Sequence, residues 1–315
     1  MNPSLRARLL IAVMQLRRER RDLEDLARFR RGLPKRDDAA DVAPPPAITA
    51  KFTVSRSQVG GRPVFRVDPP GGAIARSPIV YLHGGGFFLQ IRDGHWWTAG
   101  ELARRSGRSV IVPIYPLTPF TDCDAGSEWM LEVWRTQVES LGGGPRQRED
   151  DNKHPAAAAI VGDSAGGGLA LALCQRLRSG DLEQPKLAVL LSPWLDLTMT
   201  RPASGEELEG SDPMLAPPGL AEAGRLWAGN RSTSDPLVSP VNADLAGLPP
   251  IAVHAGTRDI LIADARRLAA RAHAAGHEIS LAEYRGLFHV FMTIPMPETA
   301  RALDAVAAQI AAANR

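Results

Sequence analysis

The sequence predicts an α/β fold with a mostly parallel central sheet and helices on both of its faces. Short apolar runs, several of them rich in β-branched residues, alternate with longer amphipathic stretches from about residue 51 to residue 315. This alternation is typical of parallel strands that are connected by helices. In addition, two of the short runs lead directly into glycine-rich segments, 83–86 and 162–167, as expected where a buried strand ends in a sharp turn.

Bulk composition excludes several classes of protein. The 315 residues are 44% hydrophobic with a net charge of +2, so the chain can form one large domain and lacks the basic excess of a nucleic-acid-binding protein. Cys123 and Cys174 are too few for a disulfide framework. No apolar run approaches the roughly 18 residues of a membrane span, and the run 9–14 is short for a signal peptide. We expect a cytoplasmic protein with no integral membrane segment, and a homodimer is one alternative for its oligomeric state.

Residues 1–50 are expected to form an N-terminal helical cap segment and a linker. Apolar residues recur at helical spacing over 4–31, with many arginines between them. Such a helix could face an anionic surface or a membrane. We favour a solvated helix face, because acidic residues are interleaved with the arginines and can pair with them. Four prolines and three aspartates within 34–47 predict the linker.

The second predicted unit, residues 51–315, is a series of strands and helices with one interruption. Strand-like runs on either side of Gly60 and Gly61 predict a hairpin at a sheet edge. Periodicity predicts further strands at 79–82, 109–115, 156–161, 187–191, 250–254 and 278–284, helices at 98–107, 124–140, 261–275 and 297–313, and an exposed loop at 142–155. The segment at about 197–235 breaks the alternation, and we expect this insertion to form part of a cap.

Ser164 lies where one of these strands meets a helix. The apolar run 156–161 precedes it, and helix-forming residues follow from Leu169. Glycines at 162 and 166 permit the tight turn that holds a serine at the top of a sheet, with free helix N–H groups behind it. The pattern predicts a nucleophilic serine, and the alternative is a glycine-rich turn with an incidental serine.

A nucleophilic serine needs a base and a carboxylate that orients the base. In this kind of fold the acid and then the histidine follow the serine along the chain. That order favours Asp259, after the strand 250–254, and His289, after the strand 278–284. Both positions follow the carboxyl ends of strands, where open α/β sheets bind their ligands. Asp196 and Asp264 are the alternative acids, and Asp264 is expected to cap or brace its loop.

The glycines at 84–86 supply backbone N–H groups that a ligand can approach closely. With the N–H of Ala165, the residue after the serine, they are suited to bind an oxyanion. A phosphate-binding loop is the alternative, but the lysine of the usual phosphate-binding motif is missing.

Together these motifs resemble the hormone-sensitive-lipase-like (bacterial family IV) esterases of the α/β-hydrolase superfamily. The segments 83–87, 162–167, 192–198 and 259–264 carry the resemblance, which extends over about 51–315. It implies hydrolysis of carboxylic esters on an α/β-hydrolase fold with a helical cap, and neither a cofactor nor a metal. It also implies a site composed of the triad Ser164, Asp259 and His289 and the oxyanion donors Gly85, Gly86 and Ala165.

The chain departs from that family at two places. Pro116 and Phe120 replace an arginine and a glutamate, and we predict that a buried Phe120 supports the glycine loop by apolar packing. The alternative is an exposed Phe120 that contacts the cap or a partner subunit. Val290 follows His289, where the family often has glycine.

The function favoured by these residues is that of a serine carboxylesterase acting on short-to-medium acyl or aryl esters through an acyl-enzyme. The substrate pocket is expected to be lined by Phe87, Phe88, Trp96, Trp97, Met214 and Trp227. Core packing is the alternative for each aromatic residue. Alternative functions are a non-catalytic small-molecule receptor, and a hydrolase of amides, lactones or carbamates built from the same parts.

Overall fold

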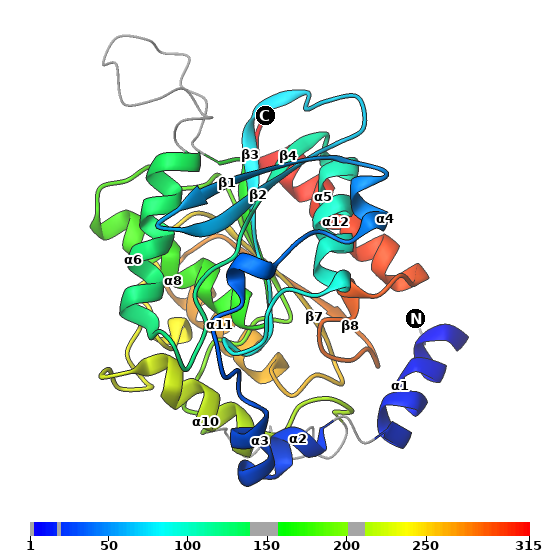
Figure 1. Ribbon diagram of the computed structural model, residues 1–315, viewed down its shortest axis with the longest axis vertical. Coiled ribbons are helices and arrows are strands. Elements are labelled where there is room, and N and C mark those ends of the chain that lie inside the picture. The colour runs from blue at the N-terminus through cyan, green and yellow to red at the C-terminus, as the bar shows by residue number, and fades with distance from the viewer. Residues whose placement is uncertain (1–2, 18–19, 139–156, 201–211) are drawn as a thin grey trace.

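A computed structural model describes residues 3–17, 20–138, 157–200 and 212–315 (Figure 1). In this part of the chain, eight strands form one sheet in the order β1-β2-β4-β3-β5-β6-β7-β8. Their bounds are β1 Thr53–Val59, β2 Arg62–Asp68, β3 Ala75–Leu82, β4 Arg108–Pro113, β5 Ala159–Asp163, β6 Ala188–Leu191, β7 Ile251–Gly256 and β8 Ile279–Tyr284.

The sheet is antiparallel at one edge and parallel elsewhere. β1 and β2 form the predicted hairpin across Gly60 and Gly61, β2 pairs antiparallel with β4, and the strands from β4 through β3 to β8 are parallel. Every residue of β5, β6 and β7 is buried, because helices cover both faces. That burial explains why these strands are continuous apolar runs without polar alternation.

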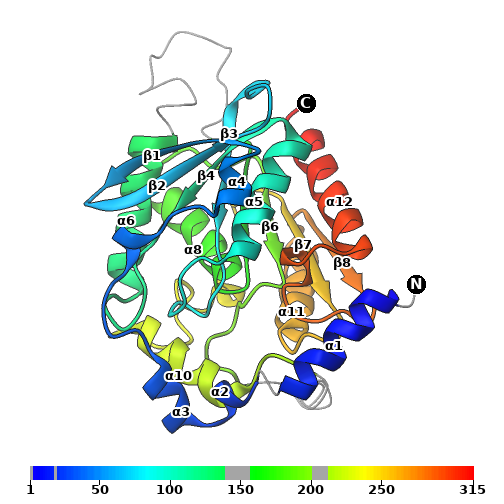
Figure 2. The same ribbon diagram turned by 45° about the vertical axis from the view of Figure 1, so that its right-hand side comes forward.

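The described helices lie on both faces of the sheet and beyond one end of it. Their bounds are α1 Leu5–Arg17, α2 Arg21–Glu24, α3 Leu26–Gly32, α4 Pro46–Thr49, α5 Asp93–Ser106, α6 Cys123–Val133, α8 Ala165–Ser179, α10 Pro217–Ala228, α11 Ile262–Ala274 and α12 Pro297–Ala313, with short 3₁₀ or π turns η1 Ala39–Asp41, η2 Trp134–Val138, η4 Pro240–Asn242 and η5 Phe291–Thr293. α5 and α12 pack together on one face, and α6, α8 and α11 lie on the other (Figures 1 and 2). The predicted α/β fold is therefore confirmed.

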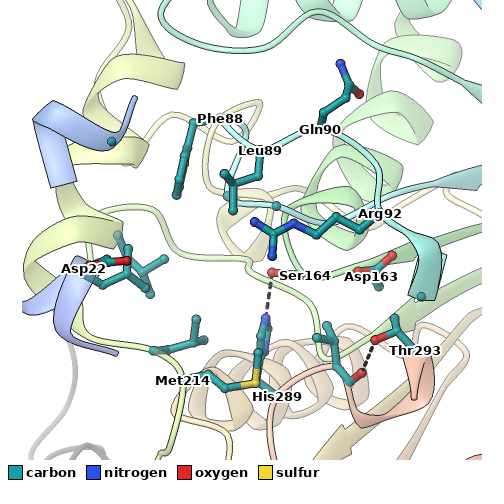
Figure 3. A pocket seen from close by; sticks show the side chains of 18 of the residues that line it. Asp22, Phe88, Leu89, Gln90, Arg92, Asp163, Ser164, Met214, His289 and Thr293 are labelled. Carbon is teal, nitrogen blue, oxygen red and sulfur yellow. Dashed lines mark hydrogen bonds between the residues drawn. The ribbon is translucent and has the colours of Figure 1, made fainter. Parts of the chain in front are cut away.

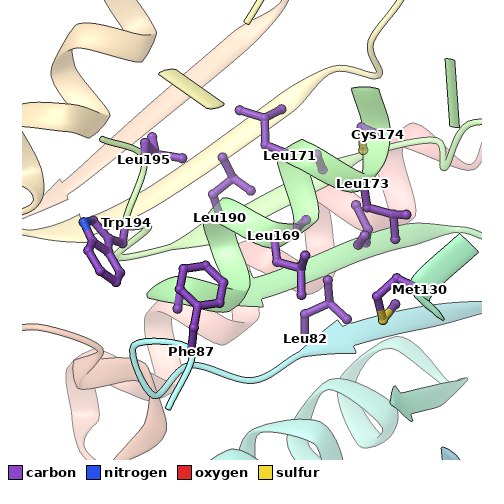
Figure 4. Packing of buried hydrophobic residues seen from close by; sticks show 14 of the residues in the cluster. Leu82, Phe87, Met130, Leu169, Leu171, Leu173, Cys174, Leu190, Trp194 and Leu195 are labelled. Carbon is purple, nitrogen blue, oxygen red and sulfur yellow. The ribbon is translucent and has the colours of Figure 1, made fainter. Parts of the chain in front are cut away.

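Two apolar clusters, one on each face of the sheet, form the core. Because side chains alternate along a strand, Val80 and Leu82 of β3 enter the cluster beneath α8, whereas Ile79 and Tyr81 enter the cluster beneath α5 and α12. Figure 4 shows the first cluster, in which Leu169 of α8 lies near the sheet residue Leu82. These clusters hold the carboxyl ends of the parallel strands in register, and all the candidate site loops begin there.

A helical cap lies over those strand ends. The region 4–31, expected to be helical, is divided into α1, α2 and α3, and α2 and α3 pack against α10 of the predicted insertion (Figures 1 and 2). The linker region contains η1 and the start of α4, and residues 201–211 of the insertion and the predicted loop 142–155 lie outside the described residues. Within the described part, no helix combines the length and apolar character needed to cross a membrane.

Candidate active site

Ser164 occupies a strained turn between β5 and α8. Its backbone has φ 52° and ψ −120°, a conformation that non-glycine residues rarely adopt. The turn is held because the Ser164 N–H donates to Leu191 O (2.9 Å) and the Ser164 carbonyl accepts from Gly167 N (3.0 Å) and Trp194 N (2.9 Å). The strained strand–turn–helix geometry predicted around this serine is therefore present.

His289 and Asp259 form a chain of hydrogen bonds that ends at this serine. His289 Nδ1 is 2.8 Å from Asp259 Oδ2, and His289 Nε2 is 2.9 Å from Ser164 Oγ (Figure 3). An ionised carboxylate can only accept, so Nδ1 carries the proton, and the neutral ring then accepts the hydroxyl proton at Nε2. Asp259 is fully buried, and its Oδ1 accepts from the Leu261 N–H at 2.8 Å, which holds the carboxylate in place.

A second buried carboxylate, Asp212, connects the cap to the Asp259 loop. Its Oδ1 accepts from Met214 N (2.8 Å) and Leu215 N (2.9 Å), and its Oδ2 accepts from Ile260 N (2.9 Å). Burial, together with the charge of Asp259, raises the pKa of Asp212 above its usual range. Three N–H donors nevertheless favour the ionised form, since a protonated acid would present a further donor to them.

These charges set the basicity of His289. Burial by itself lowers the pKa of the imidazole, but the charge and hydrogen bond of Asp259, with smaller contributions from Asp212 and Asp163, outweigh burial and raise the pKa above its ordinary value. An imidazolium is therefore better tolerated at this position than at an ordinary buried site.

The two alternative acids have other partners. Asp196 forms an ion pair with Arg267 at 2.8 Å, and its Oδ1 accepts from Thr198. Asp264 Oδ2 accepts from the backbone N–H of Asp196 at 3.2 Å, so Asp264 braces that loop. Asp259 is thus the carboxylate that the structure brings to His289.

The glycine segment 84–86 approaches the serine from β3. Gly85 has φ 120°, and a Cβ there would lie 2.5 Å from Leu89 O, so only glycine fits. Among the described groups, the N–H groups of Gly85 and Gly86 have no hydrogen-bond acceptor. Together with Ala165 at the start of α8, they form a backbone N–H cluster beside Ser164 that can receive an oxyanion.

Thr118, rather than Phe120, holds this segment. The Thr118 N–H and hydroxyl both donate to Phe87 O, at 2.8 and 3.1 Å, and the Tyr115 hydroxyl donates to His83 O at 2.6 Å. Phe120 is 44% exposed, so the prediction of a buried phenylalanine brace is wrong. Its carbon atoms face solvent because the turn at 117–120 directs it away from the core, which sequence hydrophobicity does not indicate.

His83, Asp163 and His95 form a polar cluster under the floor of the site. Burial, followed by the charge of His95, lowers the pKa of His83 to about 3, so the neutral ring donates from Nδ1 to Gly84 O at 2.7 Å. Tyr81 donates to Asp163 Oδ1 at 2.6 Å, and His95 Nε2 is 3.4 Å from Asp163 Oδ2. These contacts hold the start of the glycine segment and the residue before the serine.

The serine opens into a cavity of about 900 Å³ beneath the cap (Figure 3). Its lining includes cap residues of α2, α3 and α10 as well as the loops of the sheet. The apolar lining residues are Leu23, Phe29, Phe88, Leu89, Met214, Leu215, Leu220, Val290 and Ile294. Phe29 and Phe88 meet edge-to-face with ring centroids 5.0 Å apart, which closes one wall.

Of the six residues expected to line the pocket, the structure places Phe88 and Met214 in the cavity lining and the other four outside it. Phe87 and Trp227 stack on each other at 4.2 Å in the core, and Trp96 packs against Phe65. Trp97 packs against the same cluster as Trp96. Core packing, the alternative for each aromatic residue, applies to these four because each packs in or against one of the two apolar clusters.

Sequence patterns did not predict several of the residues that lie near the serine. Asp212 and Phe29 lie in the cap, and their relation to Ser164 exists only once the cap has folded over the sheet. Arg92 immediately precedes α5 and Thr293 ends the short turn η5, and the sequence around neither residue carries a periodic signal. The Asp-Pro pair at 212–213 is a local sign of a turn near Asp212. The described residues contain no group of three or more side chains arranged to hold a metal ion.

Comparison with known proteins agrees with this geometry. The family of the α/β hydrolase fold matches residues 79–293. An acetyl-hydrolase of Streptomyces hygroscopicus is 31% identical over 73% of this chain and 74% of that protein. Crystals of EstE5, soaked with p-nitrophenyl butyrate, contain a chain 28% identical with a TM-score of 0.81 and 99% coverage of both chains. An esterase from the bacterial hormone-sensitive lipase family is 27% identical with a TM-score of 0.77 and 98% coverage of both chains. The chain therefore belongs to the hormone-sensitive-lipase-like esterases of the α/β-hydrolase superfamily, a family of carboxylic ester hydrolases.

Proposed function

We propose that the protein is a serine carboxylesterase in which Ser164 is the nucleophile, His289 the base and Asp259 the orienting acid. The observation that carries this proposal is the continuous chain of hydrogen bonds through the three side chains, with distances of 2.9 and 2.8 Å, at the wall of the cavity beneath the cap. A nucleophile within hydrogen-bond reach of an oriented base is the arrangement that acyl transfer requires.

In the first half of the reaction Ser164 Oγ attacks the carbonyl carbon of the ester, and its proton passes to His289 Nε2. The carbonyl oxygen becomes an oxyanion that accepts hydrogen bonds from the N–H groups of Gly85, Gly86 and Ala165. His289 then gives the proton to the departing alcohol, leaving the acyl group on Ser164. In the second half water attacks this acyl group, His289 again takes and returns the proton, and the acid is released.

The substrate class that we propose is esters with a short-to-medium acyl chain or an aryl group. A cavity of about 900 Å³ is large enough for such a molecule. The Phe29–Phe88 pair closes the wall on the side of the cap, which favours chains of limited length. The acetyl-hydrolase relative and the butyrate ester soaked into EstE5 crystals support the same class.

Purified protein should release p-nitrophenol from a series of p-nitrophenyl esters with acyl chains of increasing length. Ser164→Ala and His289→Ala should each lower kcat by about 10⁶-fold, and by similar amounts, because the two groups act as a unit. Ser232→Ala, at an exposed serine, is the matched control and should retain the full rate. Hydrolysis that persists in Ser164→Ala would refute the proposal, and ester binding without any turnover would favour a receptor.

A further inference from the structure

The pocket around Ser164 has two chemically different sides. On the side of the cap the apolar Phe88 and Met214 lie close to the cap helices, and the charged Asp22 there is paired with Arg28 (Figure 3). On the side of α5 the lining includes the polar side chains of Arg92, His95 and Thr293. An ester has two arms, one on each side of its carbonyl carbon, so one arm meets the apolar side and the other meets the polar side.

Arg92 is the prominent charged group on the polar side. It immediately precedes α5, and its backbone is extended. Its backbone N–H donates to His95 Nδ1 at 2.9 Å, which holds the Arg92 backbone in place. The side chain is exposed and extends into the pocket toward Ser164 (Figure 3). Its guanidinium forms no ion pair or hydrogen bond with any residue that the structure describes, including its acidic neighbour Asp93.

The other charges that line the pocket do not neutralise Arg92. Asp22 pairs with Arg28 within the cap. Asp163 is almost completely buried, and its two oxygens face the Tyr81 hydroxyl and His95. Arg31, a further cation, also lines the cavity. The accessible charge near the serine is therefore positive.

We infer that Arg92 binds an anionic group, such as a carboxylate, on one arm of the ester, so that the enzyme prefers esters with one apolar and one anionic arm. This inference rests on the proposed ester hydrolysis. A guanidinium has a planar set of N–H donors that matches a carboxylate. Because the pocket is partly shielded from water by the cap, such a contact is stronger than on an open surface. Arg92 is thus a specificity-determining residue that takes no part in the bond-breaking steps.

The test uses two pairs of esters, each consisting of a carboxylate and its neutral carboxamide isostere. For the acyl arm the pair is mono-(4-nitrophenyl) adipate and 4-nitrophenyl adipamate. For the alcohol arm it is 3-butanoyloxybenzoate and 3-butanoyloxybenzamide. The kcat/KM ratio of carboxylate to carboxamide is measured for the parent and for Arg92→Gln, Arg92→Lys and Arg104→Gln. Arg104 pairs with Glu101 on the exposed face of α5, so its variant removes the same charge away from the pocket.

In at least one pair the parent should prefer the carboxylate, and Arg92→Gln should lower that ratio ten- to hundredfold, mainly through KM. Arg92→Lys should restore part of the preference, and Arg104→Gln should leave it unchanged. The preference should also weaken as ionic strength rises from about 0.01 M to about 1 M.

Two results would overturn the assignment of Arg92 while leaving ester hydrolysis intact. One is a parent enzyme with no carboxylate preference in either pair. The other is an Arg92→Gln variant that slows the carboxylate and carboxamide esters equally. Failure of the parent to hydrolyse any of the four esters would instead refute the proposed function itself, and the inference with it.

Discussion

Asp212→Asn removes a buried negative charge near His289 with little change of shape. In the parent, Asp212 accepts three backbone N–H groups, two from the cap and one from Ile260 beside Asp259. An asparagine side chain keeps one acceptor oxygen and replaces the other with an NH₂ donor. At least one of the buried N–H groups therefore loses its acceptor, which should lower the free energy of unfolding by about 1–3 kcal/mol.

The lost charge should also change the pH dependence. Asp212 is one of the groups that raise the pKa of His289, besides Asp259 and Asp163 and against the effect of burial. His289 must be neutral to act as a base, so activity rises with pH through its pKa. Without the Asp212 charge this pKa falls, and the acid limb of the kcat/KM profile should move to lower pH.

The same change should lower the rate on the plateau of the profile. His289 becomes a positively charged imidazolium in the transition state. The negative charge of Asp212 stabilises this ion, as it stabilises the protonated form of His289 in the free enzyme. Each pKa unit by which the limb moves corresponds to about 1.4 kcal/mol, so it should accompany a roughly tenfold loss of kcat/KM on the plateau. The shift of the acid limb therefore predicts the size of the loss of kcat/KM on the plateau.

The assay is kcat/KM for a neutral aryl ester between about pH 4 and pH 9, the range over which an imidazole near its ordinary pKa titrates. Asp196→Asn is the control, because that carboxylate is paired with Arg267 and does not contact His289. A plateau loss with an unmoved acid limb would mean that Asp212 acts only through loop geometry and would refute the electrostatic argument.

Three further predictions concern the triad, the cap and the loop after the base. Asp259→Asn should lower kcat by about four powers of ten through the wrong His289 tautomer, whereas Asp196→Asn should retain the rate; a comparable loss in both would contradict the choice of acid. Phe29→Ala should open the wall beside Phe88 and shift preference in the p-nitrophenyl series toward longer acyl chains, at a cost of about 3 kcal/mol in unfolding free energy; an unchanged chain-length profile would show that this wall does not limit the substrate. Val290 has φ 46°, a left-handed conformation that costs an L-residue about 1–2 kcal/mol, so Val290→Gly should raise the unfolding free energy by about 0.5–1 kcal/mol after the entropy cost of glycine; a lower denaturant midpoint would show that Val290 packing outweighs this strain.

Local patterns were sufficient where the geometry is made by consecutive residues. A strand followed at once by glycines and Ser164 specifies the strained turn, because few backbone paths connect a buried strand to a helix in so few residues. The parallel order of the strands then brings the loops of Asp259 and His289 to the same sheet edge, although they are 30 residues apart in sequence.

Sequence patterns did not predict the position of a side chain where that position depends on which surfaces pack together in the folded protein. Phe87 and Phe88 are adjacent in sequence and equally apolar, yet Phe87 stacks on Trp227 in the core while Phe88 meets Phe29 at the pocket wall. Likewise Phe120 is exposed, although its hydrophobicity indicates burial. Apolarity predicts that a side chain tends to be buried, but the direction of the backbone at each position decides where it points.

The sequence by itself thus determined the fold class and the arrangement of Ser164, Asp259 and His289, because these follow from short-range turn chemistry and strand order. Only the tertiary structure decided how the cap closes over that arrangement. It placed the Asp212 carboxylate beside the acid loop and the Arg92 guanidinium in the pocket. The contacts of Asp212 join segments far apart in the chain, and the packing of the cap on the sheet brings them within hydrogen-bonding or electrostatic range.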